Sequence, residues 1–240
     1  MTKPFDGLVA IVTGAGRGIG KAIGLRLAAQ GARVAFVART PSEISAAAAE
    51  AGPDALAMAC DISRDGGPEL MLEHVMERFG RLDILVHSAG TITQERIEHM
   101  NLTAFDDMLR VNLRAPYALT QTALAALKET RGQVLFINST ITRAQNIAGR
   151  GGFAATQHAL KAIADSLRDE VNEAGVRVIS LIAGTTATAR QEHLHQLSGK
   201  PYHPELLLQA ADVAQAACDA LAMPRTAEIT DVVLRPMQKS

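Results

Sequence analysis

The sequence is poor in the features that mark several classes of protein. Its 240 residues include two cysteines, Cys60 and Cys218, and each lies in an apolar stretch with no second thiol nearby. Disulfide frameworks and thiolate metal sites need cysteines in pairs or clusters. We therefore expect two reduced thiols in the core and no metal site.

The low net charge and the lack of long apolar runs exclude further classes of protein. The formal net charge is -1, which indicates neither a basic surface for nucleic acid nor an acidic tail. A membrane-spanning helix needs about 18 consecutive apolar residues, and no such run occurs, nor does an apolar run follow the N-terminal lysine. We expect a cytoplasmic protein that contacts neither membranes nor nucleic acid.

Short apolar runs alternate with helical stretches along nearly the whole chain. This alternation is typical of parallel strands joined by crossover helices, and such uniformly apolar strands are covered on both faces. No linker, repeat or low-complexity tract interrupts it. The sequence predicts one α/β domain over 1–240, a doubly wound Rossmann-type fold with helices on both faces of a seven-stranded parallel sheet. The candidate strands are 8–13, 33–38, 55–60, 82–87, 133–138, 176–182 and 229–234.

Local signals predict where helices begin and end. The stretch Thr40-Pro41-Ser42-Glu43 has the pattern of a capping box with proline at the first helical position, leading into an alanine-rich surface helix. Gly31 and Gly175 stand where two helices should stop.

The first apolar run leads directly into the glycine-rich stretch TGAGRGIG, residues 13–20. Gly14, Gly18 and Gly20 leave room for a tight turn, for a pyrophosphate close to the backbone, and for a helix packed near the strand. The N-terminus of that helix offers free N–H groups to an anion. The pattern indicates dinucleotide binding, and the alternative is a turn that serves packing alone.

The end of the second run bears on which dinucleotide is bound. An acidic residue there commonly bonds the adenosine ribose, but this chain has Ala38-Arg39. Arg39 is suited to grip a ribose 2′-phosphate, with Arg17 closing from the glycine loop. The sequence therefore favours NADP(H) over NAD(H); the alternative is that the arginines are simply solvated.

Five motifs together resemble the short-chain dehydrogenase/reductase family over nearly the full chain. They are TGAGRGIG, HSAG at 87–90, Asn112 in VNL, Ser139 in INST, and AATQHAL at 154–160. The C-terminal portion resembles the branch of NADP-dependent carbonyl reductases and hydroxy-acid dehydrogenases. The resemblance implies hydride transfer between the nicotinamide and a small carbonyl or alcohol substrate.

The resemblance also implies a set of cofactor contacts. Thr188 would bond the nicotinamide amide, in a segment where Ala183 replaces the usual proline, and Arg39 would meet the 2′-phosphate. HSAG departs from the usual Asn-Asn-Ala-Gly, which weakens the hydrogen bonding expected at this segment. The remaining implied contacts are Gly14, Arg17, Gly18, Ile19 and Gly20 at the pyrophosphate, Asp61 and Ile62 at the adenine, and Ser88, Ala89 and Gly90 beneath the nucleoside.

The catalytic set that the resemblance implies is incomplete. Asn112 and Ser139 are retained, but Phe153 and Gln157 stand at the tyrosine and lysine positions. Phenylalanine has no hydroxyl, and glutamine keeps a donor without the charge. General acid catalysis is worth about 10²- to 10⁴-fold, so we expect binding to survive where turnover is weak or lost.

Several residues are candidates for the missing acid. His158 lies about 100° around the helix from Gln157, and Lys161 lies one turn further along. The polar segment 186–207, expected to be a lid over the substrate, contributes Tyr202, His193 and His195. Three possibilities stay open: an oxidoreductase of altered activity, a silent cofactor-binding sensor or inactive subunit, and a lyase or isomerase using the same pocket.

Association of identical chains is also expected from the resemblance. Family members form dimers or tetramers through the helices that here begin near residues 103 and 152, and Tyr117 is expected to serve packing. The same apolar stretches equally suit an intramolecular core. The sequence predicts a homodimer or homotetramer.

Overall fold

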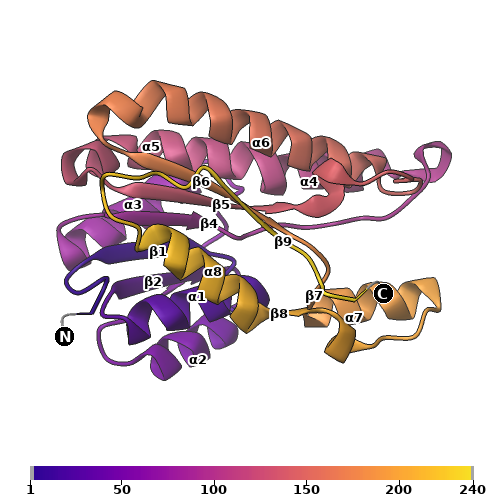
Figure 1. Ribbon diagram of the computed structural model, residues 1–240, viewed down its shortest axis with the longest axis horizontal. Coiled ribbons are helices and arrows are strands. Elements are labelled where there is room, and N and C mark those ends of the chain that lie inside the picture. Colours follow the sequence, from indigo (N-terminus) through magenta and orange to yellow (C-terminus); the bar gives the residue numbers. More distant parts are fainter. Residues whose placement is uncertain (1–2, 239–240) are drawn as a thin grey trace.

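A parallel sheet of seven strands runs through the centre of the molecule, as predicted. The computed structural model describes residues 3–238. The strands are β1 (Val9–Thr13), β2 (Arg33–Ala38), β3 (Leu56–Ala59), β4 (Ile84–His87), β5 (Gln133–Ser139), β6 (Arg177–Ala183) and β9 (Asp231–Leu234). Their spatial order is β3-β2-β1-β4-β5-β6-β9, with every neighbouring pair parallel (Figure 1). The chain order therefore reverses between β1 and β4.

Helices cover both faces of the sheet (Figure 1). Along β1, Ala10 and Val12 join the apolar core of one face, and Val9 and Ile11 join that of the other. This alternation explains why the strand sequence is apolar throughout. One face carries α1 (Gly18–Ala29), α2 (Pro41–Ala51) and α8 (Ala210–Leu221); the other carries α3 (Gly67–Phe79), α5 (Ala115–Thr130) and α6 (Gly151–Val171).

The connections between these elements contain further short structures. α4 (Leu102–Leu109) leads into α5 through a π-helical turn, Arg110–Arg114. The strands β7 (Thr186–Ala187) and β8 (Leu208–Gln209) pair with each other and flank α7 (Ala189–Ser198), away from the main sheet (Figure 1). Single 3-10 turns span Ile97–His99, Thr140–Arg143, Asn172–Ala174 and Pro204–Leu206.

The predicted helix ends are mostly found, but the predicted capping box is wrong. Thr40 is the N-cap of α2 and Pro41 its first residue, yet the Thr40 side chain makes no capping hydrogen bond. Glu43 pairs instead with Arg17, with Oε1 3.8 Å from Nη1. The Glu43 side chain packs on the glycine loop instead of capping the backbone at Thr40. Gly31, with φ of +101°, follows α1, and Gly175, with φ of +77°, ends the 3-10 turn after α6.

Both cysteines are buried and free. Burial raises the pKa of both thiols, that of Cys218 to about 12, so both stay protonated near neutral pH. Within residues 3–238, no three His, Cys, Asp or Glu side chains are grouped to hold a metal ion. None of the helices in this range combines the length and the apolar character that crossing a bilayer requires.

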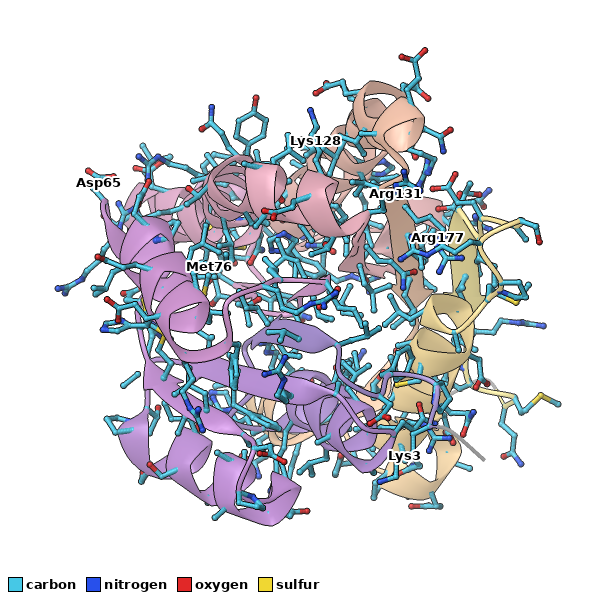
Figure 2. All side chains as sticks on the ribbon, turned by 90° about the vertical axis from the view of Figure 1, so that its left-hand side faces the viewer. Lys3, Asp65, Met76, Lys128, Arg131 and Arg177 are labelled. Carbon is cyan, nitrogen blue, oxygen red and sulfur yellow. The ribbon has the colours of Figure 1, made fainter. Side chains whose placement is uncertain are left out.

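Hydrogen bonds from Arg177 connect the amino end of β6 to the chain after α8. Buried Arg177 donates hydrogen bonds to the carbonyls of Leu221 (3.2 Å), Met223 (2.9 Å) and Ala227 (3.0 Å), which ties the end of α8 to β6. Figure 2 faces this side of the molecule and shows Arg177 between the sheet and the C-terminal helix. The glycine loop, Arg39, Asp61 and Ser139 lie at the opposite, carboxyl ends of β1, β2, β3 and β5.

Candidate cofactor and active site

Thr13, at the carboxyl end of β1, organises the crevice where the strand order reverses. Its hydroxyl donates to the carbonyl of Val86 (3.2 Å) and accepts from the backbone N–H groups of Ser88 (3.1 Å) and Ala89 (3.2 Å). In open α/β sheets, ligands bind at such a reversal. No local pattern in the sequence marks Thr13, because its role depends on residues more than 70 positions away.

The glycine loop has no room for side chains at two positions. A Cβ on Gly14, whose φ is +65°, would lie 2.8 Å from the backbone N and Cα of Ala89. A Cβ on Gly20 would lie 2.5 Å from the carbonyl oxygen of Gly14, so α1 begins directly against the loop. Among residues 3–238, the N-cap residue of α1, Arg17, makes no side-chain capping hydrogen bond. A tight loop feeding an uncapped helix fits the pyrophosphate of a dinucleotide.

The same loop meets the segment that precedes α7. A Cβ on Gly18, whose φ is +58°, would lie 3.4 Å from Cγ2 of Thr188. Thr188 is the N-cap of α7, and its hydroxyl accepts a hydrogen bond from the N–H of Gln191 (3.3 Å). The structure thus brings Thr188 to the glycine loop, although 170 residues separate it from Gly18.

Arg39, Asp61 and Ile62 lie together beyond the carboxyl ends of β2 and β3. Ile62 is buried, whereas Arg39 is exposed. Burial acts to raise the pKa of Asp61, but hydrogen bonds from Ser63 and the charges of Arg39 and Arg64 outweigh it and lower the pKa. The Asp61 carboxylate is therefore ionised and within electrostatic reach of Arg39.

Glu43 places a carboxylate beside the expected phosphate site, which the sequence analysis did not anticipate. A Cβ on Gly16 would lie 2.9 Å from Oε2 of Glu43, so this side chain packs on the glycine loop. Its partner Arg17 is largely exposed, and exposed ion pairs contribute about 0 to 1 kcal/mol. Arg17 can leave Glu43 for a phosphate at little cost.

Asn112 joins three segments around the start of α6. It lies in the π-helical turn, a distortion that is frequent at functional sites. Its Oδ1 accepts from the N–H of Thr91 (2.7 Å), and its Nδ2 donates to the Thr91 carbonyl (2.8 Å) and to Oγ1 of Thr156 (3.1 Å). Thr156 in turn donates to the carbonyl of Phe153 (2.8 Å).

Asn138 holds the end of β5 against α6. Its Nδ2 donates to the carbonyl of Gln157 (3.2 Å), and its Oδ1 accepts from the N–H of Ser139 (2.7 Å). The Ser139 hydroxyl accepts from the N–H of Ile141 (3.2 Å). Asn112, Ser139, Phe153 and Gln157 are thereby gathered around the first two turns of α6. The buried linkers Asn138 and Thr156 were missed, since nothing local marks them.

The comparisons with known proteins show the family of the chain. A family model described as "short chain dehydrogenase" matches residues 8–198. The chain belongs to this family. An "uncharacterized oxidoreductase" of Staphylococcus epidermidis is 30% identical over 230 residues, which cover 95% of this chain and 97% of that protein. The chain is therefore assigned to a family of oxidoreductases.

Solved structures share the fold of this short chain dehydrogenase over almost its whole length. An alcohol dehydrogenase of the archaeon Thermococcus sibiricus, complexed with 5-hydroxy-NADP, is 29% identical with a TM-score of 0.86, covering 97% of this chain and 98% of that one. A 3-ketoacyl-(acyl-carrier-protein) reductase of Brucella melitensis, complexed with NADH, is 26% identical with a TM-score of 0.85, covering 95% and 98%.

Two candidates on α6 for the missing acid are poorly placed in this short chain dehydrogenase. His158 is exposed. Lys161 is engaged elsewhere, because its Nζ lies 2.5 and 2.6 Å from the Asp165 carboxylate oxygens and 3.3 Å from Oδ1 of Asp231. His158 thus lies on the solvent side of α6, and Lys161 is held by two carboxylates.

Two of the three candidates on the segment 186–207 contact each other. The rings of His195 and Tyr202 lie 5.3 Å apart, and Nδ1 of His195 contacts the carbonyl of Gln191 (2.9 Å), while His193 is exposed. Burial and the charge of Glu192 raise the pKa of Tyr202 against a backbone hydrogen bond at Thr188 that lowers it. A raised pKa makes Tyr202 a weaker acid.

His87, the first residue of HSAG, is a buried titratable group that the sequence analysis did not single out. Its ring stacks on Phe136 at 4.8 Å, and its Nε2 lies 2.9 Å from Oγ1 of Thr120. Its Nδ1 has no hydrogen-bond partner among residues 3–238. Burial lowers the pKa of His87 to about 3. The imidazole is therefore neutral at physiological pH and cannot donate charge to the site.

Proposed function

We propose that this chain is an NADP(H)-binding oxidoreductase that transfers hydride between the nicotinamide and a small carbonyl or alcohol substrate, slowly. The geometry of the glycine loop is the observation that supports cofactor binding. Gly14 abuts the Ala89 backbone, and Gly20 abuts Gly14. The loop therefore brings backbone, without side chains in the way, to the free amides at the N-terminus of α1, as a pyrophosphate requires.

The preference for NADP(H) is proposed from the charge at the adenosine end. The Thermococcus structure contains an NADP derivative and the Brucella structure contains NADH, so both dinucleotides occur among similar folds. In this chain Arg39 follows β2, and Arg17 is displaceable from Glu43. Two guanidinium groups favour the 2′-phosphate through charge-assisted hydrogen bonds.

The slow turnover is proposed from what surrounds the reacting carbon. NADP(H) supplies or accepts the hydride when bound. Ser139 can donate its hydroxyl to the substrate oxygen, and Gln157 can donate an amide to a ribose hydroxyl, but Phe153 offers only an apolar wall. The charge that develops on the oxygen then lacks a proton donor, which is the reason for weak activity.

A silent cofactor-binding role is the second candidate. The observation in its favour is that Lys161 is held by two carboxylates and His158 is exposed, so α6 supplies no substitute acid. In that case the chain would act as a sensor or as the inactive subunit of a hetero-oligomer. The wild-type rate separates the two roles: NADPH-dependent reduction of a small ketone or aldehyde above the rate without protein supports slow turnover, and no such reduction supports the silent role.

Arg39→Ala tests the cofactor preference. Loss of a charge-assisted hydrogen bond should weaken NADPH binding by roughly 1.5 to 3 kcal/mol and leave NADH binding almost unchanged. Calorimetric titration of both cofactors measures this. Arg64→Ala is the matched control, because it removes a neighbouring positive charge that is exposed and only weakly paired, 3.7 Å from Asp61. An equal loss for both cofactors would remove the selectivity argument.

We also propose that identical chains associate and that residues 186–207 cover the substrate. Tyr117 does not pack inside its own chain, since 56% of it is exposed, and Ile97 and Leu102 are 92% and 73% exposed nearby in the sequence. Association would bury this apolar surface. Sedimentation at micromolar concentration should show a dimer or tetramer, and a monomer would refute the proposal.

A further inference from the structure

α7 is weakly attached to the rest of the molecule. None of its ten residues is buried. Within residues 3–238, one hydrogen bond joins it to the Rossmann body: Nη2 of Arg190 donates to the carbonyl oxygen of Gly90 at 2.6 Å. Segments with few buried contacts open at low free energy. Pairing of β7 with β8 holds the two ends of the segment that contains α7, and Arg190 is the side chain that joins α7 itself to the residues after β4.

Arg190 is poorly compensated where it lies. It takes part in none of the ion pairs formed among residues 3–238. Arg190 is exposed, and desolvation by nearby protein atoms and then the charge of Arg17 lower its pKa. Arg17 has only a weak partner in Glu43, 3.8 Å away, and Arg190 has a single neutral acceptor, so the two guanidinium groups carry an excess of positive charge. An anion placed between them would remove that cost.

The surroundings of Arg190 specify which anion fits. Its contact Gly90 follows β4, and Thr188, two residues before Arg190, touches Gly18 of the glycine loop. The guanidinium thus lies between the glycine loop and the residues after β4. In the proposed function this gap holds the diphosphate of the dinucleotide, which carries two negative charges and offers oxygens for a bidentate contact.

We propose that Arg190 exchanges the Gly90 carbonyl for the diphosphate of the bound dinucleotide and so closes α7 over the cofactor. The inference rests on the proposed function, because it requires a dinucleotide in the site. Binding of the cofactor then orders the segment that covers the substrate, since the same side chain serves both. Arg190 is a binding and positioning residue in this scheme and takes no part in proton transfer.

The test compares Arg190→Gln with the wild-type chain for two ligands. NADPH carries the diphosphate, whereas adenosine 2′-monophosphate carries the 2′-phosphate alone. Arg190→Gln should bind NADPH about 10- to 100-fold more weakly, as expected for a lost charge-assisted hydrogen bond, and adenosine 2′-monophosphate within about twofold of wild type. Lys200→Gln, which removes a charge from the same exposed segment, is the matched control and should change neither.

Hydrogen exchange gives a readout independent of activity. Saturating NADPH should slow exchange of the backbone amides of residues 189–198 in the wild-type chain and in Lys200→Gln, but not in Arg190→Gln. If Arg190→Gln binds NADPH as tightly as wild type, or Lys200→Gln weakens binding equally, the proposed contact between Arg190 and the diphosphate is wrong. The proposed cofactor site would not be affected by that result. If the wild-type protein binds no NADPH, the proposed function is wrong, and so is the proposed contact between Arg190 and the diphosphate.

Discussion

Phe153 and Gln157 differ from tyrosine and lysine by one hydroxyl and one charge, and they occupy the same helical face. Gln157 is buried and its carbonyl is fixed by Asn138, while Phe153 is connected through Thr156 to Asn112. The backbone that would present a proton donor is thus in place. At the residue scale the proposed defect is chemical, and two substitutions should repair it.

The combined variant Phe153→Tyr and Gln157→Lys should gain reductase activity. With the acid and its neighbouring charge supplied, kcat/KM for NADPH-dependent reduction of a small ketone or aldehyde should rise by about 100-fold or more over wild type. Each single variant should gain less, because a tyrosine without the adjacent charge keeps a high pKa. Steady-state loss of NADPH absorbance measures the rate.

Phe153→Tyr combined with His158→Lys is the matched control for this experiment. It adds the same hydroxyl and the same charge, but the lysine stands on the exposed side of α6. No gain is expected from it. A folded Phe153→Tyr and Gln157→Lys variant that binds NADPH and still reduces nothing would show that the substrate pocket, and not the acid alone, differs from that of active relatives.

The turn between β1 and α1 is the element on which cofactor binding depends. Gly14→Ala should abolish measurable NADPH binding and lower the free energy of unfolding, because its Cβ would overlap the Ala89 backbone at 2.8 Å. Gly7→Ala separates this overlap from backbone strain. Gly7 also has a positive φ, +74°, but no atom within 4 Å of its Cβ. It should cost about 1 to 2 kcal/mol and leave NADPH affinity unchanged.

Chemical denaturation and calorimetric titration of the two variants give both quantities. Equal NADPH affinities in Gly14→Ala and the wild-type chain would mean that the contact between the loop and Ala89 is not needed for binding.

Most of the elements could be predicted because they are specified locally. All seven predicted strands are present with ends within two residues of those expected, since each is a continuous apolar run between turn residues. β7 and β8 were not predicted, because two residues carry no periodicity. The capping-box prediction was wrong although its pattern is local, because Glu43 pairs with Arg17, which is distant in the sequence.

The candidate site is predictable only in part, for reasons that concern the whole molecule. The glycine loop and Asn112, Ser139, Phe153 and Gln157 were identified from motifs, and the structure places them at the carboxyl ends of the strands. Thr13, Asn138, Thr156 and Arg190 were missed. Their contacts span from 19 to 100 residues of sequence, so no short pattern reveals them.

His87 links the stability of the whole molecule to pH. The folded chain holds it neutral with a pKa of about 3, whereas the unfolded chain protonates it near pH 6.5. Below pH 6.5 the unfolded state therefore binds a proton that the folded state does not, and stability falls as the pH falls toward 3. The slope approaches 1.36 kcal/mol per pH unit.

Denaturant unfolding of wild type and His87→Gln between pH 7 and pH 5 tests this link. The wild-type chain should lose about 2 kcal/mol more than the variant over this range, since glutamine does not titrate. Carboxylates such as Asp61 and Asp165, whose pKa values are lowered, act below about pH 4 and cancel in the comparison. Parallel curves for the two proteins would contradict the assignment.

The central claim is that a working NADP(H) site has been kept while the proton donor has been lost. Titration of the wild-type chain with NADPH and with NADH, followed by nicotinamide fluorescence, tests it most directly. Saturable binding with NADPH preferred about tenfold or more is the predicted result, as one charge-assisted hydrogen bond to the 2′-phosphate requires. Failure of both dinucleotides to bind would contradict the account and leave the glycine loop with a purely structural role.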